Sequence, residues 1–99
     1  MINGAALVDD AHNALAKELG DVSRIKTRLI VAEEVCVGEH GTAGAMMHVT
    51  LLLLEGRDVD TKKQYSAAIL DAIKTHLAAM PKCKLTCEVR DMDKETYVL

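Results

Sequence analysis

The sequence predicts an α+β fold, in which a duplicated β-α-β arrangement carries two helices on one face of a sheet and lacks its first strand. Two observations lead to this prediction. An almost continuous apolar run (residues 46–54) is followed by an amphipathic helical pattern (residues 60–79) and an alternating strand (residues 83–90). The first half of the chain repeats the order of a helix followed by a strand, with a helix over residues 5–19 and a strand over residues 24–37. A strand, a crossover helix and a parallel strand form one unit, so both halves are expected to share a sheet.

The first helix is predicted over residues 5–19. Apolar side chains recur there at steps of three and four, which places them on one helical face. Gly20 follows as a natural C-terminal stop. The apolar positions are Leu7, Val8, Ala11, Ala14, Leu15 and Leu19.

Residues 24–37 predict a strand because they are rich in aliphatic and β-branched side chains. Glu33 and Glu34 mark a bend or an exposed patch within it. The loop at residues 38–44 contains three glycines. They lack the spacing of a nucleotide-binding fingerprint, so we expect a flexible turn and no phosphate site.

Residues 46–54 predict a buried strand, although a run this short also fits a buried helix. A polar loop at residues 55–58 leads into the helix over residues 60–79, with Asp60 as its predicted N-cap. Pro81 cannot continue a helix, so the helix is expected to end just before it. The apolar stripe of this helix consists of Tyr65, Ala68, Ile69, Ala72, Ile73, His76, Leu77 and Met80.

Arg57 lies between the carboxyl end of the central strand and the start of the following helix, where ligands usually bind in such units. It is flanked by Glu55 and Asp58. The alternative is an exposed arginine with acidic neighbours, which contributes little to stability.

Residues 83–90 predict the last strand, because apolar and polar residues alternate there and place one face in the core. A polar tail at residues 91–96 follows. Residues 97–99 either dock on a neighbouring copy or fray.

The first helix is preceded by four residues, too few for a strand parallel to residues 24–37. Residues 24–37 are therefore expected to leave an unpaired edge. With both helices on one face, the other face of the sheet is bare and too apolar for open water, so we expect a closed homo-oligomer. The residues on this face are Met46, His48, Thr50, Leu52 and Leu54.

Composition narrows the classes of function. The 99 residues fit a single domain (residues 1–99), and the absence of Phe and Trp leaves little bulk for a core, which favours self-association. The net charge of -3, with no basic stripe, argues against nucleic-acid binding. We expect no membrane contact and a soluble, cytoplasmic protein, because neither a membrane span nor a signal peptide is present. Cys36, Cys83 and Cys87 lack disulfide and zinc-site patterns, so no metal or other cofactor is expected.

Several short segments together resemble 5-carboxymethyl-2-hydroxymuconate delta-isomerase of the tautomerase superfamily. The resemblance covers nearly the whole chain from the first helix onward, as a spaced set of matches. The segments are Ile25-Lys26-Thr27-Arg28, His48-Val49-Thr50-Leu51, Gly56-Arg57, Ile73-Lys74-Thr75-His76-Leu77, and Leu85-Thr86-Cys87-Glu88-Val89-Arg90 followed by Asp91-Met92-Asp93.

The resemblance implies a homotrimer with the bare sheet face at its centre. It also implies a proton shift on a carboxylated, muconate-type substrate from aromatic catabolism, with an N-terminal proline amine as the base and arginines holding the carboxylates. By this resemblance Arg57 binds substrate, and Lys26 takes the position of a second arginine. Lysine keeps the positive charge but lacks the planar guanidinium that binds a carboxylate through two hydrogen bonds. Arg28 on the same strand can compensate for this weaker binding.

The catalytic proline of the family has no counterpart in this sequence, so no catalytic residue is assigned. Residue 2 is Ile, and the single proline is Pro81, inside the chain. The amine expected instead is that of Met1, at the start of a helix and away from the pocket. Two explanations stay open: the true start lies upstream, or the chain is a shortened, catalytically altered relative.

Two functions therefore remain: an isomerase of this family, or a catalytically silent oligomeric binding or structural module of the same fold. A third, a ferredoxin-like metal or RNA module, has little support. His48 and His76 are expected to be satisfied core or interface residues, not acids or bases.

Overall fold

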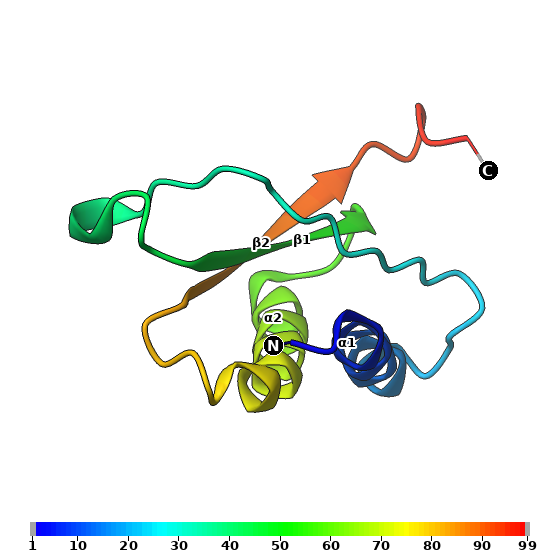
Figure 1. Cartoon of the computed structure of the whole chain (residues 1–99). Helices are drawn as coiled ribbons and strands as arrows, with labels where there is room; N and C mark the ends of the chain where they lie inside the picture. The colour runs from blue at the N-terminus through cyan, green and yellow to red at the C-terminus, as the bar shows by residue number, and fades with distance from the viewer. Residues whose placement is uncertain (1, 99) are drawn as a thin grey trace.

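In the computed structural model, which describes residues 2–98, two α-helices lie on one face of a two-stranded parallel sheet (Figure 1). Met1 and Leu99 lie outside the described residues, and so do the expectations placed on the Met1 amine and on Leu99. The elements in order are α1 (Gly4–Leu19), η1 (Gly38–His40), β1 (Met46–Leu54), α2 (Val59–Lys74), η2 (Thr75–Leu77) and β2 (Lys84–Met92).

Helix α1 confirms its prediction at nearly every residue. Its N-cap is Asn3, whose side-chain oxygen accepts a hydrogen bond from the backbone N–H of Ala6 at 3.1 Å. At the other end Gly20 takes a left-handed conformation and donates its N–H to the carbonyl of Ala16. This ending satisfies a terminal carbonyl and stops the helix where the sequence predicts.

Helix α2 differs from its prediction at both ends. The N-cap is Asp58 and not Asp60, because the Asp58 side chain accepts from the backbone N–H of Thr61 at 2.8 Å. At the other end the α-helix stops at Lys74 and tightens into η2. There the hydroxyl of Thr75 donates to the carbonyl of Ala72 and competes with the helical bonding pattern, so the α-helix ends well before Pro81.

Strand β1 has the predicted bounds and pairs in parallel with β2. The register runs without a break from Met46 opposite Lys84 to Leu54 opposite Met92. Strand β2 continues two residues beyond its predicted end because β1 offers it a partner along its whole length.

The predicted strand over residues 24–37 is wrong. Residues 24–36 form no strand, and Val37 makes an isolated bridge to Gly41. Among the described residues, residues 26–36 have no backbone–backbone hydrogen bond. In Figure 1 this cyan segment passes from the end of α1 to η1 and runs opposite to β1. A strand exists only within a hydrogen-bonded ladder, and this segment has no partner.

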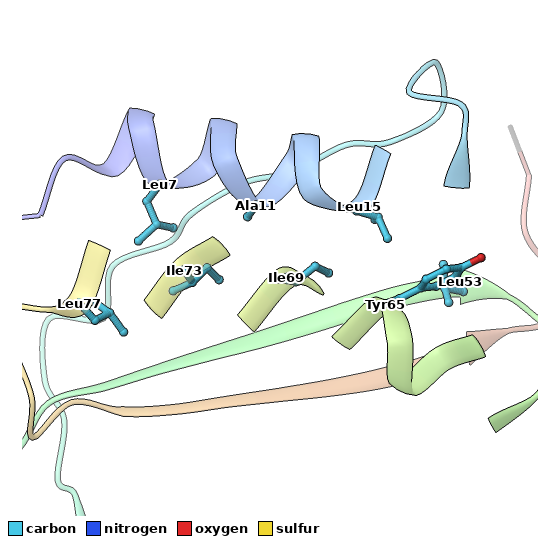
Figure 2. Close-up of a cluster of buried hydrophobic side chains, with 8 residues drawn as sticks. All are labelled: Leu7, Ala11, Leu15, Leu53, Tyr65, Ile69, Ile73 and Leu77. Atoms are coloured by element: carbon cyan, nitrogen blue, oxygen red, sulfur yellow. The ribbon is translucent and has the colours of Figure 1, made fainter. Parts of the chain in front are cut away.

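The core lies between the helices and the sheet (Figure 2). It confirms the two predicted helical stripes, because the most deeply buried side chains come from them. Ile73 is 2% exposed and lies at the centre of this layer. The buried residues are Leu7, Ala11 and Leu15 of α1, Leu53 of β1, Tyr65, Ile69 and Ile73 of α2, and Leu77 of η2.

The opposite face of the sheet is bare, as predicted. Alternate residues of both strands are exposed there, and they include Met46 and Leu52, whose exposed fractions are 48% and 52%. On this face Nδ1 of His48 lies 2.7 Å from the hydroxyl oxygen of Thr86, so His48 is satisfied. Within residues 2–98, no helix is long and apolar enough to cross a membrane.

Candidate functional site

A groove of about 1800 Å³ runs along β1. All nine residues of β1 form one wall, and residues 23–32 form the opposite wall. The floor is apolar and comes mainly from α1, through Leu7, Val8, Ala11, Leu15 and Leu19.

Arg57 lies where β1 ends and lines this groove. Gly56, just before it, has a φ of 120°, which L-residues rarely adopt, so the turn that positions Arg57 needs glycine. The Arg57 Nη1 donates a hydrogen bond to the Leu54 carbonyl at 3.3 Å. The guanidinium carbon lies 5.9 Å from the centre of the Tyr65 ring, within range of a cation–π contact. Because Tyr65 is buried, the guanidinium rests against a fixed surface.

The acidic neighbours of Arg57 are engaged elsewhere. Asp58 caps α2, and this hydrogen bond to Thr61 holds the pKa of Asp58 below its ordinary value. A carboxylate oxygen of Glu55 accepts from the backbone N–H of Lys94 at 3.3 Å. Arg57 forms no ion pair with any described residue. Its charge is therefore available to an anion.

Lys26 and Arg28 lie on the opposite wall of the same groove. Both are exposed, and neither forms an ion pair within the described part of the chain. Between them, the hydroxyl oxygen of Thr27 lies 2.8 Å from Nδ1 of His12 and tethers this wall to α1. The structure thus brings all three predicted binding residues to one groove.

The electrostatic balance of the groove favours anions. Its lining contains one further cation, Arg24, and a single acidic side chain, Asp21. Asp21 accepts a hydrogen bond from the backbone N–H of Ser23 at 2.9 Å, which lowers the pKa of its carboxyl group. A carboxylate that enters this groove meets a surplus of positive charge.

Sequence reasoning missed two contacts that shape the site. Tyr65 was expected only as part of a buried stripe, and no local pattern links it to Arg57. No local pattern links His12 to Thr27, because the two residues are 15 positions apart in the chain.

Cys87 is half-buried on β2. Burial raises the pKa of the Cys87 thiol, although a hydrogen bond with Ser66 partly offsets this rise. Residues 2–98 contain no group of three His, Cys, Asp or Glu side chains placed to hold a metal ion. A raised thiol pKa disfavours the reactive thiolate, which is consistent with a structural role for Cys87.

Comparison with known proteins agrees with this architecture. The family described as 5-carboxymethyl-2-hydroxymuconate isomerase matches residues 2–98. A solved structure, FG41 malonate semialdehyde decarboxylase inhibited by 3-bromopropiolate, has a TM-score of 0.51 and 22% sequence identity, covering 88% of this chain and 72% of that chain. At this identity the likeness concerns the fold, which is an α+β, tautomerase-type fold in both. No curated protein matches the chain.

Proposed function

Because this chain belongs to the 5-carboxymethyl-2-hydroxymuconate isomerase family, we propose that it binds a small, carboxylated, muconate-type keto acid and acts as an isomerase. Family membership supports tautomerase-like chemistry. The observation that carries the choice of substrate is Arg57, which is unpaired among the described residues and stacked on Tyr65 at the end of a basic groove.

Arg57 is the anchor of the substrate in this proposal. A guanidinium donates two parallel hydrogen bonds to one carboxylate, a geometry that lysine cannot reproduce. Lys26 and Arg28 hold the second carboxylate from the opposite wall. Hydrogen bonds to charged groups contribute roughly 1.5–3 kcal/mol each, so loss of the Arg57 contact should weaken binding by at least about tenfold.

The proposed reaction moves one proton along a conjugated chain. A base removes the proton next to a carbonyl, the electron pair shifts to form a dienolate, and the proton returns at a different carbon. The groove cations stabilise the negative charge that develops.

A second candidate is a catalytically silent binding module of the same fold. One observation favours it: the groove lining includes no proline, and its single acidic side chain, Asp21, is already hydrogen-bonded to Ser23. The two candidates share the binding site and differ in turnover.

The test combines turnover and binding. If the chain is an isomerase, it should accelerate the ketonisation of phenylenolpyruvate, which is monitored by ultraviolet absorbance. Arg57→Ala should abolish this acceleration. Lys63→Ala is the matched control, because Lys63 is an exposed cation outside the groove. Calorimetric binding of cis,cis-muconate without turnover would select the silent module. If the chain neither accelerates ketonisation nor binds the dicarboxylate, both candidates are wrong.

The proposed assembly is a closed homo-oligomer, a trimer, formed through the bare face of the sheet. Met46 and Leu52 supply its exposed apolar surface. Burial of such a patch is the usual reason for association. We further propose that the protein works in the cytoplasm, in the breakdown of aromatic compounds.

A further inference from the structure

Tyr65 and Arg57 meet at the start of α2, although they lie eight positions apart in the sequence. Arg57 immediately precedes the N-cap Asp58, whereas Tyr65 lies about two turns into the helix. Side chains of an α-helix tilt toward its N-terminus, so the Tyr65 ring is directed back toward the turn that carries Arg57. The guanidinium carbon lies 5.9 Å from the centre of this ring. The contact therefore depends on the helix and on the turn that leads into it.

The core holds Tyr65 in place. The residue is 8% exposed and belongs to the cluster of buried hydrophobic side chains. Figure 2 shows it at one end of the row of core side chains that α2 and η2 contribute. Arg57 is exposed, and a free arginine side chain samples many rotamers. Tyr65 is thus the rigid member of the pair, and it restricts the motion of Arg57.

The backbone of β1 holds the guanidinium from a second direction. Nη1 of Arg57 donates to the Leu54 carbonyl at 3.3 Å, and this is the only hydrogen bond that the Arg57 side chain makes with residues 2–98. The N–H groups of Nε and Nη2 therefore keep their donors for a ligand. These two nitrogens form one edge of the planar guanidinium, with parallel N–H bonds. That edge has the geometry that a carboxylate requires.

We propose that Tyr65 is the positioning residue of the carboxylate site, because it holds Arg57 with its Nε–Nη2 edge open to the substrate. The carboxylate binds side-on through Nε and Nη2, while Nη1 keeps its bond to Leu54. An arginine that is already ordered loses less conformational freedom on binding, so this arrangement increases affinity. The inference rests on the proposed function, since it concerns the carboxylate that Arg57 binds there.

The first experiment tests the contact without a ligand. An aromatic ring shifts the NMR resonances of protons near it through its ring current. In the wild-type chain, the Cδ and Nε protons of Arg57 should be displaced from their random-coil positions. Tyr65→Phe keeps the ring and should preserve the displacement, whereas Tyr65→Leu should remove it. Wild-type resonances at random-coil positions, or a displacement that survives in Tyr65→Leu, would overturn the proposal.

The second experiment measures the binding of cis,cis-muconate by calorimetry. Tyr65→Leu should weaken binding by roughly two- to tenfold, the usual cost of ordering one flexible side chain. Tyr65→Phe should bind as tightly as the wild type. In the Arg57→Ala background, Tyr65→Leu should cause no additional loss, because the ring acts only through Arg57. An equal loss from Tyr65→Leu in both backgrounds would contradict a positioning role.

Leu77→Val is the matched control, because it separates positioning from stability. Leu77 is buried in the same core but lies outside the groove lining. Both Leu77→Val and Tyr65→Leu should lower the urea midpoint, and only Tyr65→Leu should weaken muconate binding. If Leu77→Val weakens binding as much as Tyr65→Leu, the effect is one of stability and the proposal is wrong.

The same titrations distinguish failure of this inference from failure of the proposed function. If muconate binds equally well to the wild type and to Tyr65→Leu, the positioning role is overturned and the proposed carboxylate site stands. If muconate binds to neither chain, the proposed carboxylate site is wrong, and the positioning role is overturned with it.

Discussion

At the scale of single residues, Asp58 connects the stability of α2 to the availability of Arg57. Its carboxylate caps the helix through the N–H of Thr61, and this bond lowers the pKa of Asp58. A carboxyl group whose pKa is lower in the folded state stabilises that state above its ordinary pKa. The contribution is lost as the pH falls from about 4 through the folded value.

Asp58→Ala should therefore lower the urea midpoint at pH 7, and the difference from the wild type should shrink toward pH 3. Asp58→Asn keeps an acceptor oxygen for the cap and should be more stable than Asp58→Ala. Asp60→Asn is the control, because Asp60 is the second residue of α2 and is not the cap. An effect of Asp58→Ala that is equal at both pH values would contradict this account.

The three thiols should differ widely in reactivity. Cys36 is exposed, whereas partial burial raises the pKa of Cys87. With a disulfide reagent at pH 8, Cys36 should react first and Cys87 much more slowly, because only the thiolate attacks. Cys36→Ser should remove the fast phase, and a fast phase that survives this change would disprove the assignment.

Part of the site could be predicted from the sequence. Arg57 was placed correctly in the loop after β1, because turn residues separate two strongly patterned segments there. Its contact with the Tyr65 ring exists only in the folded chain. The Glu55 carboxylate does not pair with Arg57 because it accepts a hydrogen bond from the backbone N–H of Lys94. His76 was expected to be satisfied, and its Nε2 lies 2.6 Å from Oδ2 of Asp10. No local sequence pattern predicts this contact, because Asp10 lies 66 positions before His76.

At the scale of elements, Ile73 is the side chain on which the packing of α2 between α1 and the sheet most depends. It is 2% exposed. Ile73→Ala should cost about 2–5 kcal/mol of unfolding free energy, since it removes buried methyl groups and leaves a cavity. Urea denaturation measures the loss.

Val59→Ala is the matched control for this prediction. Val59 begins α2 and is 62% exposed, so its truncation should change stability by less than about 0.5 kcal/mol. Equal losses in the two variants would show that the core is not where the structure places it.

The predicted elements succeeded where the signal is local. The helical stripes and the alternation in β2 are properties of consecutive residues, so α1, β1 and β2 were found to within two residues at each end. The predicted α2 extends five residues beyond the observed C-terminal end at Lys74. Residues 24–37 failed because their strand content depends on a partner, and the described residues supply none. Sequence propensity measures how well a residue suits a ladder and not whether the ladder exists.

At the scale of the whole molecule, the bare sheet face should determine the state of association. Leu52 lies on this face, is 52% exposed, and pairs with Arg90 of β2. Leu52→Glu should convert the proposed oligomer to monomers, because a carboxylate at the interface would lose its hydration. Sedimentation velocity measures this change.

Val59→Glu is the control for Leu52→Glu. It places the same charge at an exposed apolar position outside the sheet. A wild-type chain that sediments as a monomer at all concentrations would contradict the proposed assembly.

The edge of β1 away from β2 pairs with no strand among the described residues, and this has a consequence for handling the purified chain. Residues 46–54 combine high β propensity with no Asp, Glu, Lys, Arg or Pro. Such segments, when their backbone groups are open, stack into cross-β fibrils. In the 99-residue chain, we therefore expect amyloid formation to compete with the native fold, starting from a strand that is already folded. Fibril formation should accelerate with protein concentration, whereas unfolding should not. It should also occur at temperatures where the helices are intact.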